Sequence, residues 1–207
     1  MNPAAYVFNK HAQLYHEKFG DVSLYREGLD MFCYMLTDDA EVLDIACGPG
    51  NISRYLLDRK PRLDVLGIDL APAMVEIAGK INPEAKFEVM DSRNTPNLDS
   101  KFDAVVCAFL LPYLSPDETS QLIRDITMLL NEGGVLYVST MVENDDNVSG
   151  IRVSSKGDAL FQHYHKKEFV EGELMASGYS ISYNNVIEYP APDGKKTSDL
   201  VIIAERA

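Results

Sequence analysis

A glycine-rich turn and two aspartates are the residues of this sequence best suited to hold a ligand. The turn spans residues 47–50, between an apolar run and a helical pattern. Gly48 and Gly50 let the backbone approach a ligand closely, and the helix that follows offers unpaired N–H groups. Asp69 ends the next apolar run and Asp91 ends the one after it. An acid about 20 residues past such a turn is typical of a ribose-binding site, so the pattern predicts a nucleotide pocket.

The residues around this turn favour a cationic ligand over a dinucleotide. Asp44 precedes Gly48 by four positions, and its charge would oppose a pyrophosphate but suit an ammonium or sulfonium group. Ser53 stands where the dinucleotide fingerprint requires its third glycine. Two structural alternatives stay open: a plain strand-to-helix turn, and an Asp69 that only caps the following helix.

Short apolar runs alternate with helical patterns through most of the chain. The runs predict five buried parallel strands at 41–46, 63–69, 86–90, 102–108 and 135–140. Helices are predicted at 51–60, 72–81 and 116–130, the last with Ser115 and Glu118 as a capping box and Gly133 with Gly134 as its stop. This alternation predicts an α/β fold with a doubly wound parallel sheet.

The two ends of the chain add further elements. A helix at 166–177 precedes two strands, 179–189 and 198–206, joined by a turn at 190–196, and this hairpin requires an antiparallel strand. Helices at 3–19 and 23–36 form an N-terminal lid region, 1–37. The polar segment 142–165 is a candidate substrate loop, or alternatively a surface insertion. We expect a single domain covering residues 1–207.

Five segments match one set of motifs. Residues 44–50 read D-I-A-C-G-P-G and residues 67–74 read G-I-D-L-A-P-A-M, followed by matches at 91–92, 102–106 and 130–136. Together they resemble the class I S-adenosylmethionine-dependent methyltransferases over residues 40–205, although Ala46 replaces the first motif glycine. The resemblance implies a three-layer Rossmann-like sandwich with strand order 3-2-1-4-5-7-6 and an antiparallel seventh strand. It also implies S-adenosyl-L-methionine as the cofactor.

The same resemblance assigns roles to the matched positions. The glycine turn and Asp44 would hold the methionine moiety, Asp69 the ribose, and the turn at 108–110 would border the sulfonium. The N-terminal segment 8–15 resembles the cofactor-covering helix of the small-molecule branch, so that Tyr15 either reaches the cofactor or caps the core. The full set of expected cofactor-binding residues is Asp44, Ala46, Gly48, Gly50, Asp69, Leu70, Asp91, Ser92, Ala108 and Tyr15.

The sequence indicates the methyl acceptor less clearly than the cofactor, because in-line methyl transfer mainly requires alignment in a dry cavity. Segment 161–169 resembles an aromatic and histidine stretch of the same branch, which makes His165 and His163 candidate bases. One of them could instead cap the following helix. A metal would need a third ligand, so none is expected. The acceptor pocket should also use Tyr15, Phe109, Leu111, Tyr113 and Phe161.

Composition limits the classes of molecule that this protein is expected to bind. The 207 residues carry a net charge of -13, which disfavours nucleic acid and anionic membrane surfaces. Cys33, Cys47 and Cys107 are odd in number and widely spaced, which indicates reduced thiols and a cytoplasmic protein. The sequence thus predicts a methyltransferase acting on a small-molecule acceptor. The alternatives are an NAD(P)-dependent oxidoreductase and a catalytically silent cofactor-binding partner subunit.

Overall fold

A seven-stranded sheet forms the centre of the computed structural model, which describes residues 2–154, 156–190 and 196–207. Its strands are β1 (Glu41–Ile45), β2 (Asp64–Asp69), β3 (Lys86–Val89), β4 (Phe102–Ala108), β5 (Leu130–Met141), β8 (Tyr179–Pro190) and β9 (Lys196–Arg206). They lie in the order β3-β2-β1-β4-β5-β9-β8, and β9 is antiparallel to both neighbours. The predicted order and the antiparallel last strand are confirmed. Residues 191–195, most of the predicted turn before β9, lie outside the described residues.

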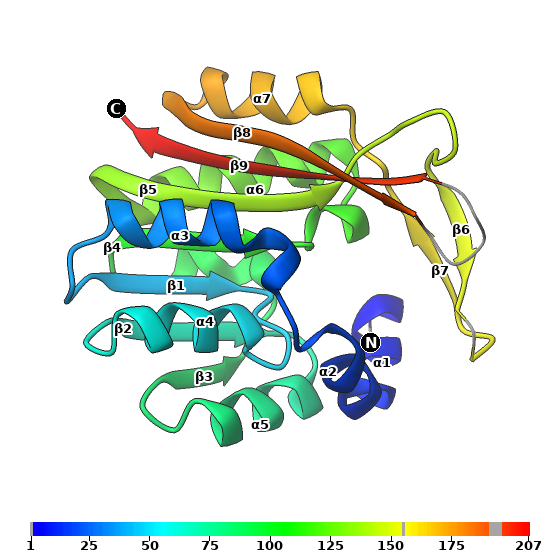
Figure 1. Ribbon diagram of the computed structural model, residues 1–207, viewed down its shortest axis with the longest axis horizontal. Helices are drawn as coiled ribbons and strands as arrows, with labels where there is room; N and C mark the ends of the chain where they lie inside the picture. The colour runs from blue at the N-terminus through cyan, green and yellow to red at the C-terminus, as the bar shows by residue number, and fades with distance from the viewer. Residues whose placement is uncertain (1, 155, 191–195) are drawn as a thin grey trace.

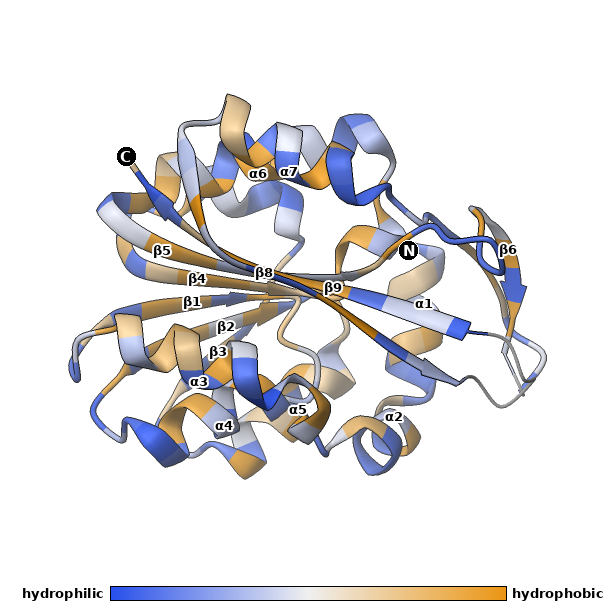
Figure 2. Cartoon of the chain, turned by 45° about the horizontal axis from the view of Figure 1, so that its top comes forward, coloured by the Kyte–Doolittle hydropathy of each residue, from blue (hydrophilic) through white to orange (hydrophobic). Residues whose placement is uncertain are grey.

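Helices cover both faces of the sheet and give three layers (Figure 1, Figure 2). One face carries α3 (Arg26–Met35), α4 (Asn51–Arg59) and α5 (Pro72–Ile81), and the other carries α6 (Pro116–Leu129) and α7 (Lys167–Ala176). The apolar side chains of the central strands alternate between these layers. Val42 packs in the cluster with α3 and α4, whereas Leu43 packs with α6 and α7. The predicted three-layer α/β sandwich is therefore confirmed.

The passage from α6 into β5 shows how local sequence sets an element boundary. Ser115 and Glu118 form the predicted capping box at the start of α6. The predicted helix, 116–130, ends within one residue of the observed one, since α6 ends at Leu129 and Leu130 is extended, with ψ of 145°. Gly133 and Gly134 are not its stop, because they follow this end by several residues. Leu130 is fully buried and pairs with Phe102 of β4, so tertiary burial ends the helix before the glycines do.

The N-terminal segment lies over the carboxyl ends of β1 to β3 as two short helices (Figure 1). They are α1 (Pro3–Lys10) and α2 (Ala12–Phe19), separated by His11, whose ψ of 20° breaks the predicted single helix. Both pack on α5, and the side-chain oxygen of Asn9 accepts a 2.9 Å bond from the Ala73 N–H. The second predicted helix divides into η1 (Ser23–Tyr25) and α3.

Residues 142–165, predicted without regular structure, contain an antiparallel hairpin. Its strands are β6 (Gly150–Val153) and β7 (Ala159–Gln162), which form a separate two-stranded sheet. The hairpin approaches the N-terminal helices through Asp158, whose carboxylate lies 2.9 Å from Lys10 Nζ and 2.7 Å from His11 Nε2. Lid helices and hairpin thus cover the same edge of the sheet. Among the described residues, no helix is long and apolar enough to cross a membrane.

Candidate active site

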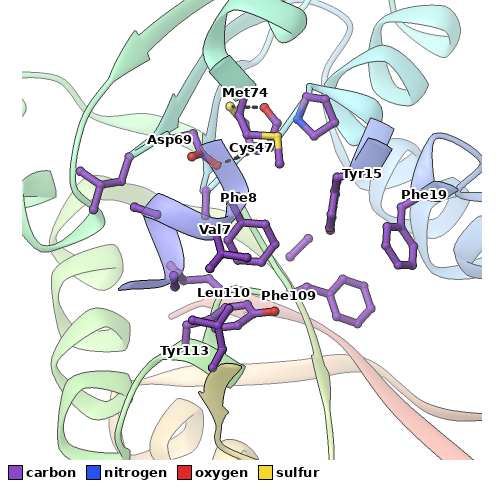
Figure 3. Close-up of a pocket in the computed structure, with 18 of the residues that line it drawn as sticks. Val7, Phe8, Tyr15, Phe19, Cys47, Asp69, Met74, Phe109, Leu110 and Tyr113 are labelled. Atoms are coloured by element: carbon purple, nitrogen blue, oxygen red, sulfur yellow. Dashed lines mark hydrogen bonds between the residues drawn. The ribbon is translucent and has the colours of Figure 1, made fainter. Parts of the chain in front are cut away.

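A cavity of about 790 Å³ opens at the carboxyl ends of the parallel strands. Its walls come from the turns after β1, β2, β3 and β4, from α1 and α2, and from the β6–β7 hairpin. Figure 3 shows Phe8, Tyr15 and Tyr113 facing a common space bordered by Asp69 and Cys47. Such a volume is typical of a pocket for a cofactor or a drug-sized ligand, and its place is the usual ligand crevice of an open parallel sheet.

The glycine turn between β1 and α4 is held in left-handed backbone conformations. Ala46, Gly48 and Gly50 have φ values of 55°, 55° and 79°. Nothing lies within 4 Å of where a Cβ of Gly48 would stand, whereas a Cβ on Gly50 would lie 2.5 Å from the Asn82 amide nitrogen. Gly48 therefore leaves open space on the cavity wall, and Gly50 allows α4 to pack closely on α5. Ala46 carries backbone strain of about 1–2 kcal/mol that the glycine found at this position of the family motif would avoid.

Asp69 joins the first two turns. Its Oδ2 accepts a 3.0 Å bond from the Gly48 N–H, and its Oδ1 accepts a 2.8 Å bond from the Ala71 N–H at the start of α5. Burial raises the pKa of this carboxyl, and the two backbone bonds oppose the rise. Each oxygen keeps a lone pair for a further donor. The capping alternative does not describe this residue, because Ala71 is the N-cap of α5 and no side chain caps that helix. Asp69 instead bonds the backbone just before α5 and lines the cavity.

Asp44 supplies a buried carboxyl beneath the turn. Ser53 donates a 2.6 Å bond from its hydroxyl to Asp44 Oδ2, and only 1% of Asp44 is exposed. Burial raises its pKa to about 7, the Ser53 bond lowers it, and the charge of Asp69 raises it further. Two acidic groups on one wall favour a cationic ligand. The serine that interrupts the dinucleotide fingerprint is therefore the partner of this carboxyl.

Asp91 lies at the next strand end but is already occupied. Arg93 approaches its two oxygens with Nε at 3.0 Å and Nη2 at 2.6 Å, and this pair lowers the pKa of the Asp91 carboxyl. Any amino group of a ligand must share these oxygens with Arg93. Except for Gly50, all the expected cofactor-binding residues line the cavity: Asp44, Ala46, Gly48, Asp69, Leu70, Asp91, Ser92, Ala108 and Tyr15.

The part of the cavity where we expected the acceptor is lined by aromatic residues. The Phe8 ring meets Tyr15 at 5.6 Å and Tyr113 at 5.1 Å, both edge to face. Phe109 lines the cavity from a strained position directly after β4, with φ of 55°. Leu111 and Phe161, which we expected here, are not among the lining residues. Their places are taken by residues of the hairpin: Arg152, Val153, Ser154, Asp158, Leu160 and Gln162.

The two histidines are not among the lining residues either. His165 is 5% exposed, and its Nε2 lies 3.0 Å from the Leu111 carbonyl oxygen and 3.2 Å from that of Leu114. Burial lowers the pKa of His165. The His163 ring stacks on it at 5.8 Å. Within the described part of the chain, no cluster of three or more His, Cys, Asp or Glu could hold a metal.

Sequence reasoning missed a group formed by Tyr25, Tyr189 and Asp199. Both tyrosines line the cavity, and both donate to Asp199 Oδ2, at 2.7 Å and 2.9 Å. Asp199 is fully buried, and burial raises its pKa. The available signal was a carboxylate directly before the apolar run of the last strand. Nothing in the sequence linked that carboxylate to Tyr25, which lies 174 residues away.

Comparison with known proteins finds similarity to methyltransferases. Residues 42–134 match the family model described as a methyltransferase domain. A demethylmenaquinone methyltransferase of Thermotoga maritima is 34% identical over 157 residues, covering 74% of this chain and 65% of that protein. The chain spans about half to two thirds of the length of the curated relatives it matches. Its coverage is 65% of the Thermotoga maritima protein and 45% and 62% of two others.

Solved structures agree at the level of the fold. A SAM-dependent methyltransferase of Methanosarcina mazei matches with a TM-score of 0.73 and 23% identity, covering 85% of this chain and 96% of that one. The 1,6-didemethyltoxoflavin-N1-methyltransferase of Burkholderia thailandensis, solved with 1,6-didemethyltoxoflavin and S-adenosylhomocysteine bound, matches with a TM-score of 0.72 and 19% identity. That match covers 99% of this chain and 88% of the other.

Proposed function

Because this chain belongs to the class I S-adenosylmethionine-dependent methyltransferases, we propose that it transfers a methyl group from S-adenosyl-L-methionine to a small-molecule acceptor. The observation that carries the proposal is the wall formed by the glycine turn, Asp69 and Asp44 on one cavity. A bound S-adenosylmethionine supplies an electrophilic methyl group on a sulfonium. The two carboxyls favour its positive charges, and the open side of Gly48 leaves room for a ligand to approach the backbone.

The roles of individual residues follow from their places on the wall. Asp69 accepts hydrogen bonds from the ribose hydroxyls with its remaining lone pairs, and Asp44 holds the ammonium end. Leu70 packs on the adenine, whose amino group shares the Asp91 carboxylate with Arg93. The aromatic residues around Phe8 exclude water from the acceptor end, so that alignment in a dry cavity supplies most of the catalysis. We assign no base role to His163 or His165, since neither lines the cavity.

The nature of the partners rests on charge and on the relatives. The similar proteins named for demethylmenaquinone and 1,6-didemethyltoxoflavin act on small molecules, and the net charge of -13 disfavours nucleic acid. The segment 109–114 also lacks the Asn/Asp-Pro-Pro-Tyr pattern of adenine N6-methyltransferases. Three free, buried cysteines support a reducing compartment such as the cytoplasm. We propose that residues 1–207 act as one domain.

Calorimetric titration tests the cofactor assignment. S-adenosylhomocysteine should bind saturably and raise the melting temperature by linkage, whereas NADH should not bind. The control is Asp64→Ala, at the opposite end of β2 on an exposed side chain, which should bind S-adenosylhomocysteine like the parent. Saturable binding of NADH with a flat S-adenosylhomocysteine titration would favour the oxidoreductase alternative. Binding without methyl transfer to any acceptor, from labelled S-adenosylmethionine, would favour the silent partner subunit.

A further inference from the structure

The group of Tyr25, Tyr189 and Asp199 lies at the acceptor end of the cavity. Tyr25 belongs to η1, which follows α2 in the N-terminal segment, and its ring lies 5.3 Å from that of Phe109. Phe109 belongs to the turn after β4, which the family resemblance puts beside the sulfonium. Asp199 pairs in register with Met141 of β5, another lining residue. These contacts bring the two phenols close to the place where the acceptor must lie.

The hydrogen-bond directions decide what this group offers a ligand. Both tyrosine hydroxyls donate their single proton to the same oxygen, Asp199 Oδ2. Their oxygens therefore have only lone pairs left for the cavity. Within the described residues, Asp199 Oδ1 has no hydrogen-bond partner, and no cation forms a salt bridge with this carboxylate. A buried carboxylate held by two phenols strengthens the acceptor character of both phenol oxygens.

A ligand group placed against the two oxygens must accordingly be a donor. A hydroxyl or a ring N–H satisfies them, whereas an ether has no proton to give. A carboxylate would set a third acceptor and a second negative charge against the group, and unpaired polar groups of this kind strongly disfavour the wrong ligand. The same buried charge disfavours an anion placed directly against the two phenol oxygens.

We propose that Tyr25 and Tyr189, positioned by Asp199, select acceptors that present an O–H or N–H donor and reject acceptors that present a carboxylate there. The inference rests on the proposed methyltransferase function and gives its acceptor a chemical class. Tyr25 and Tyr189 contact the acceptor in this account, and Asp199 is a positioning residue that acts through them.

Fragment binding to the protein saturated with S-adenosylhomocysteine tests this directly, without need of the true acceptor. The probes are small aromatic molecules: phenol and benzimidazole carry a donor, whereas anisole and benzoate carry none at neutral pH. We expect the donor probes to bind at least about 10-fold more tightly than the others, because the others leave the buried phenol oxygens without a donor. The Tyr25→Phe/Tyr189→Phe double variant should reduce this preference below about 3-fold and keep the parent's S-adenosylhomocysteine affinity.

A matched control exists on the far side of α4. Tyr55 donates to the exposed Asp30 at 2.8 Å and does not line the cavity, so Tyr55→Phe should keep the full preference. If the double variant loses its cooperative melting transition, Tyr25→Phe and Asp199→Asn are tested singly, and each should lower the preference at least about 3-fold. A merely structural role would lower the melting temperature and leave the preference intact.

Any one of three results would overturn this inference while leaving the proposed function standing. Anisole or benzoate could bind as tightly as phenol, or the preference for donor probes could survive the tyrosine substitutions. The third is that neither donor probe binds up to its solubility limit. Failure of S-adenosylhomocysteine itself to bind would instead overturn the proposed function. The two failures are therefore distinguishable in the same set of titrations.

Discussion

The two ends of the cavity are built in different ways. The cofactor end is formed by the turns after β1, β2 and β3, and its key contacts join backbone groups to carboxylates, as in the bond from the Gly48 N–H to the Asp69 side chain. The acceptor end joins segments distant in sequence through side chains, for example Lys10 with Asp158 and Tyr25 with Asp199. A site made of local backbone geometry can be shared across a family, whereas side-chain contacts between distant segments can vary with the substrate.

The largest expected effect comes from a glycine at the cofactor end. Gly50→Ala should destabilise the protein by about 2–5 kcal/mol, because the new Cβ meets Asn82 and Ala78 at a φ of 79°. Gly48→Ala is the comparison: it adds strain of about 1–2 kcal/mol but meets no atom within 4 Å. It should fold and yet bind S-adenosylhomocysteine poorly. Urea unfolding and calorimetry measure both, and similar stability losses in the two variants would contradict this division.

Asp69→Ala should weaken S-adenosylhomocysteine binding by roughly 10- to 150-fold, because the charged acceptor for the ribose hydroxyls is lost. The variant should still fold, although the Gly48 and Ala71 N–H groups also lose their acceptor. Calorimetry beside a melting curve separates the two consequences. Unchanged affinity in a folded variant would remove Asp69 from the ribose site.

His165→Ala distinguishes a structural histidine from a base. The ring bonds the buried carbonyls of Leu111 and Leu114, so its loss should cost about 1–3 kcal/mol of stability with little change in turnover. A base would behave differently, with turnover falling roughly 10²- to 10⁴-fold. His163→Ala is the companion variant, and the His163 ring makes ring contacts with Phe161 and His165. A large turnover loss in either folded variant would restore histidine to the mechanism.

Asp44 should make the unliganded protein sensitive to pH. Its pKa is about 7 in the fold against an ordinary 3.8, so between these values the folded state holds a proton that the unfolded state lacks. Its contribution to stability is full below the lower value and is lost as pH rises through the upper one. The melting temperature of Asp44→Asn should therefore increase relative to that of the parent as pH rises. A constant difference across this range would contradict the raised pKa.

The affinity for S-adenosylhomocysteine should increase with pH, whereas the stability contribution of Asp44 decreases. If the Asp44 carboxylate holds the ammonium end of the cofactor, the parent should bind S-adenosylhomocysteine more tightly as pH rises through about 7. Asp44→Asn, which keeps an oxygen for the Ser53 hydroxyl, should lose this dependence. Calorimetry across the range measures both proteins, and parallel curves would exclude Asp44 from the ligand site.

The smallest expected effect concerns the contact between lid and hairpin. Asp158→Asn removes the charge shared by Lys10 and His11. The melting temperature and the S-adenosylhomocysteine affinity should change little, because exposed ion pairs contribute little to stability. Binding of phenol to the S-adenosylhomocysteine complex should weaken modestly, since both contacting segments line the cavity. A larger effect on S-adenosylhomocysteine than on phenol would contradict the separation of the two ends.

What the sequence could predict follows the same division. The strands and the helix cap at Ser115 were accessible, because periodicity and capping act over a few positions. The strand order and most lining positions of the cofactor end followed instead from the resemblance to a known family. The break at His11 accompanies a bond to Asp158, 147 residues away, and the extended conformation of Leu130 accompanies its full burial; no local pattern carries either contact. The contact of the hairpin with the N-terminal helices and the Tyr25 to Asp199 contact depend on segments that meet only in the fold.

The most direct test of the central claim is a crystal structure of the protein with S-adenosylhomocysteine bound. The account predicts the ligand across the carboxyl ends of β1 and β2, with both ribose hydroxyls within hydrogen-bond distance of the Asp69 carboxylate and the amino acid moiety against Gly48. A ligand bound elsewhere, or one whose ribose is not held by Asp69, would contradict it.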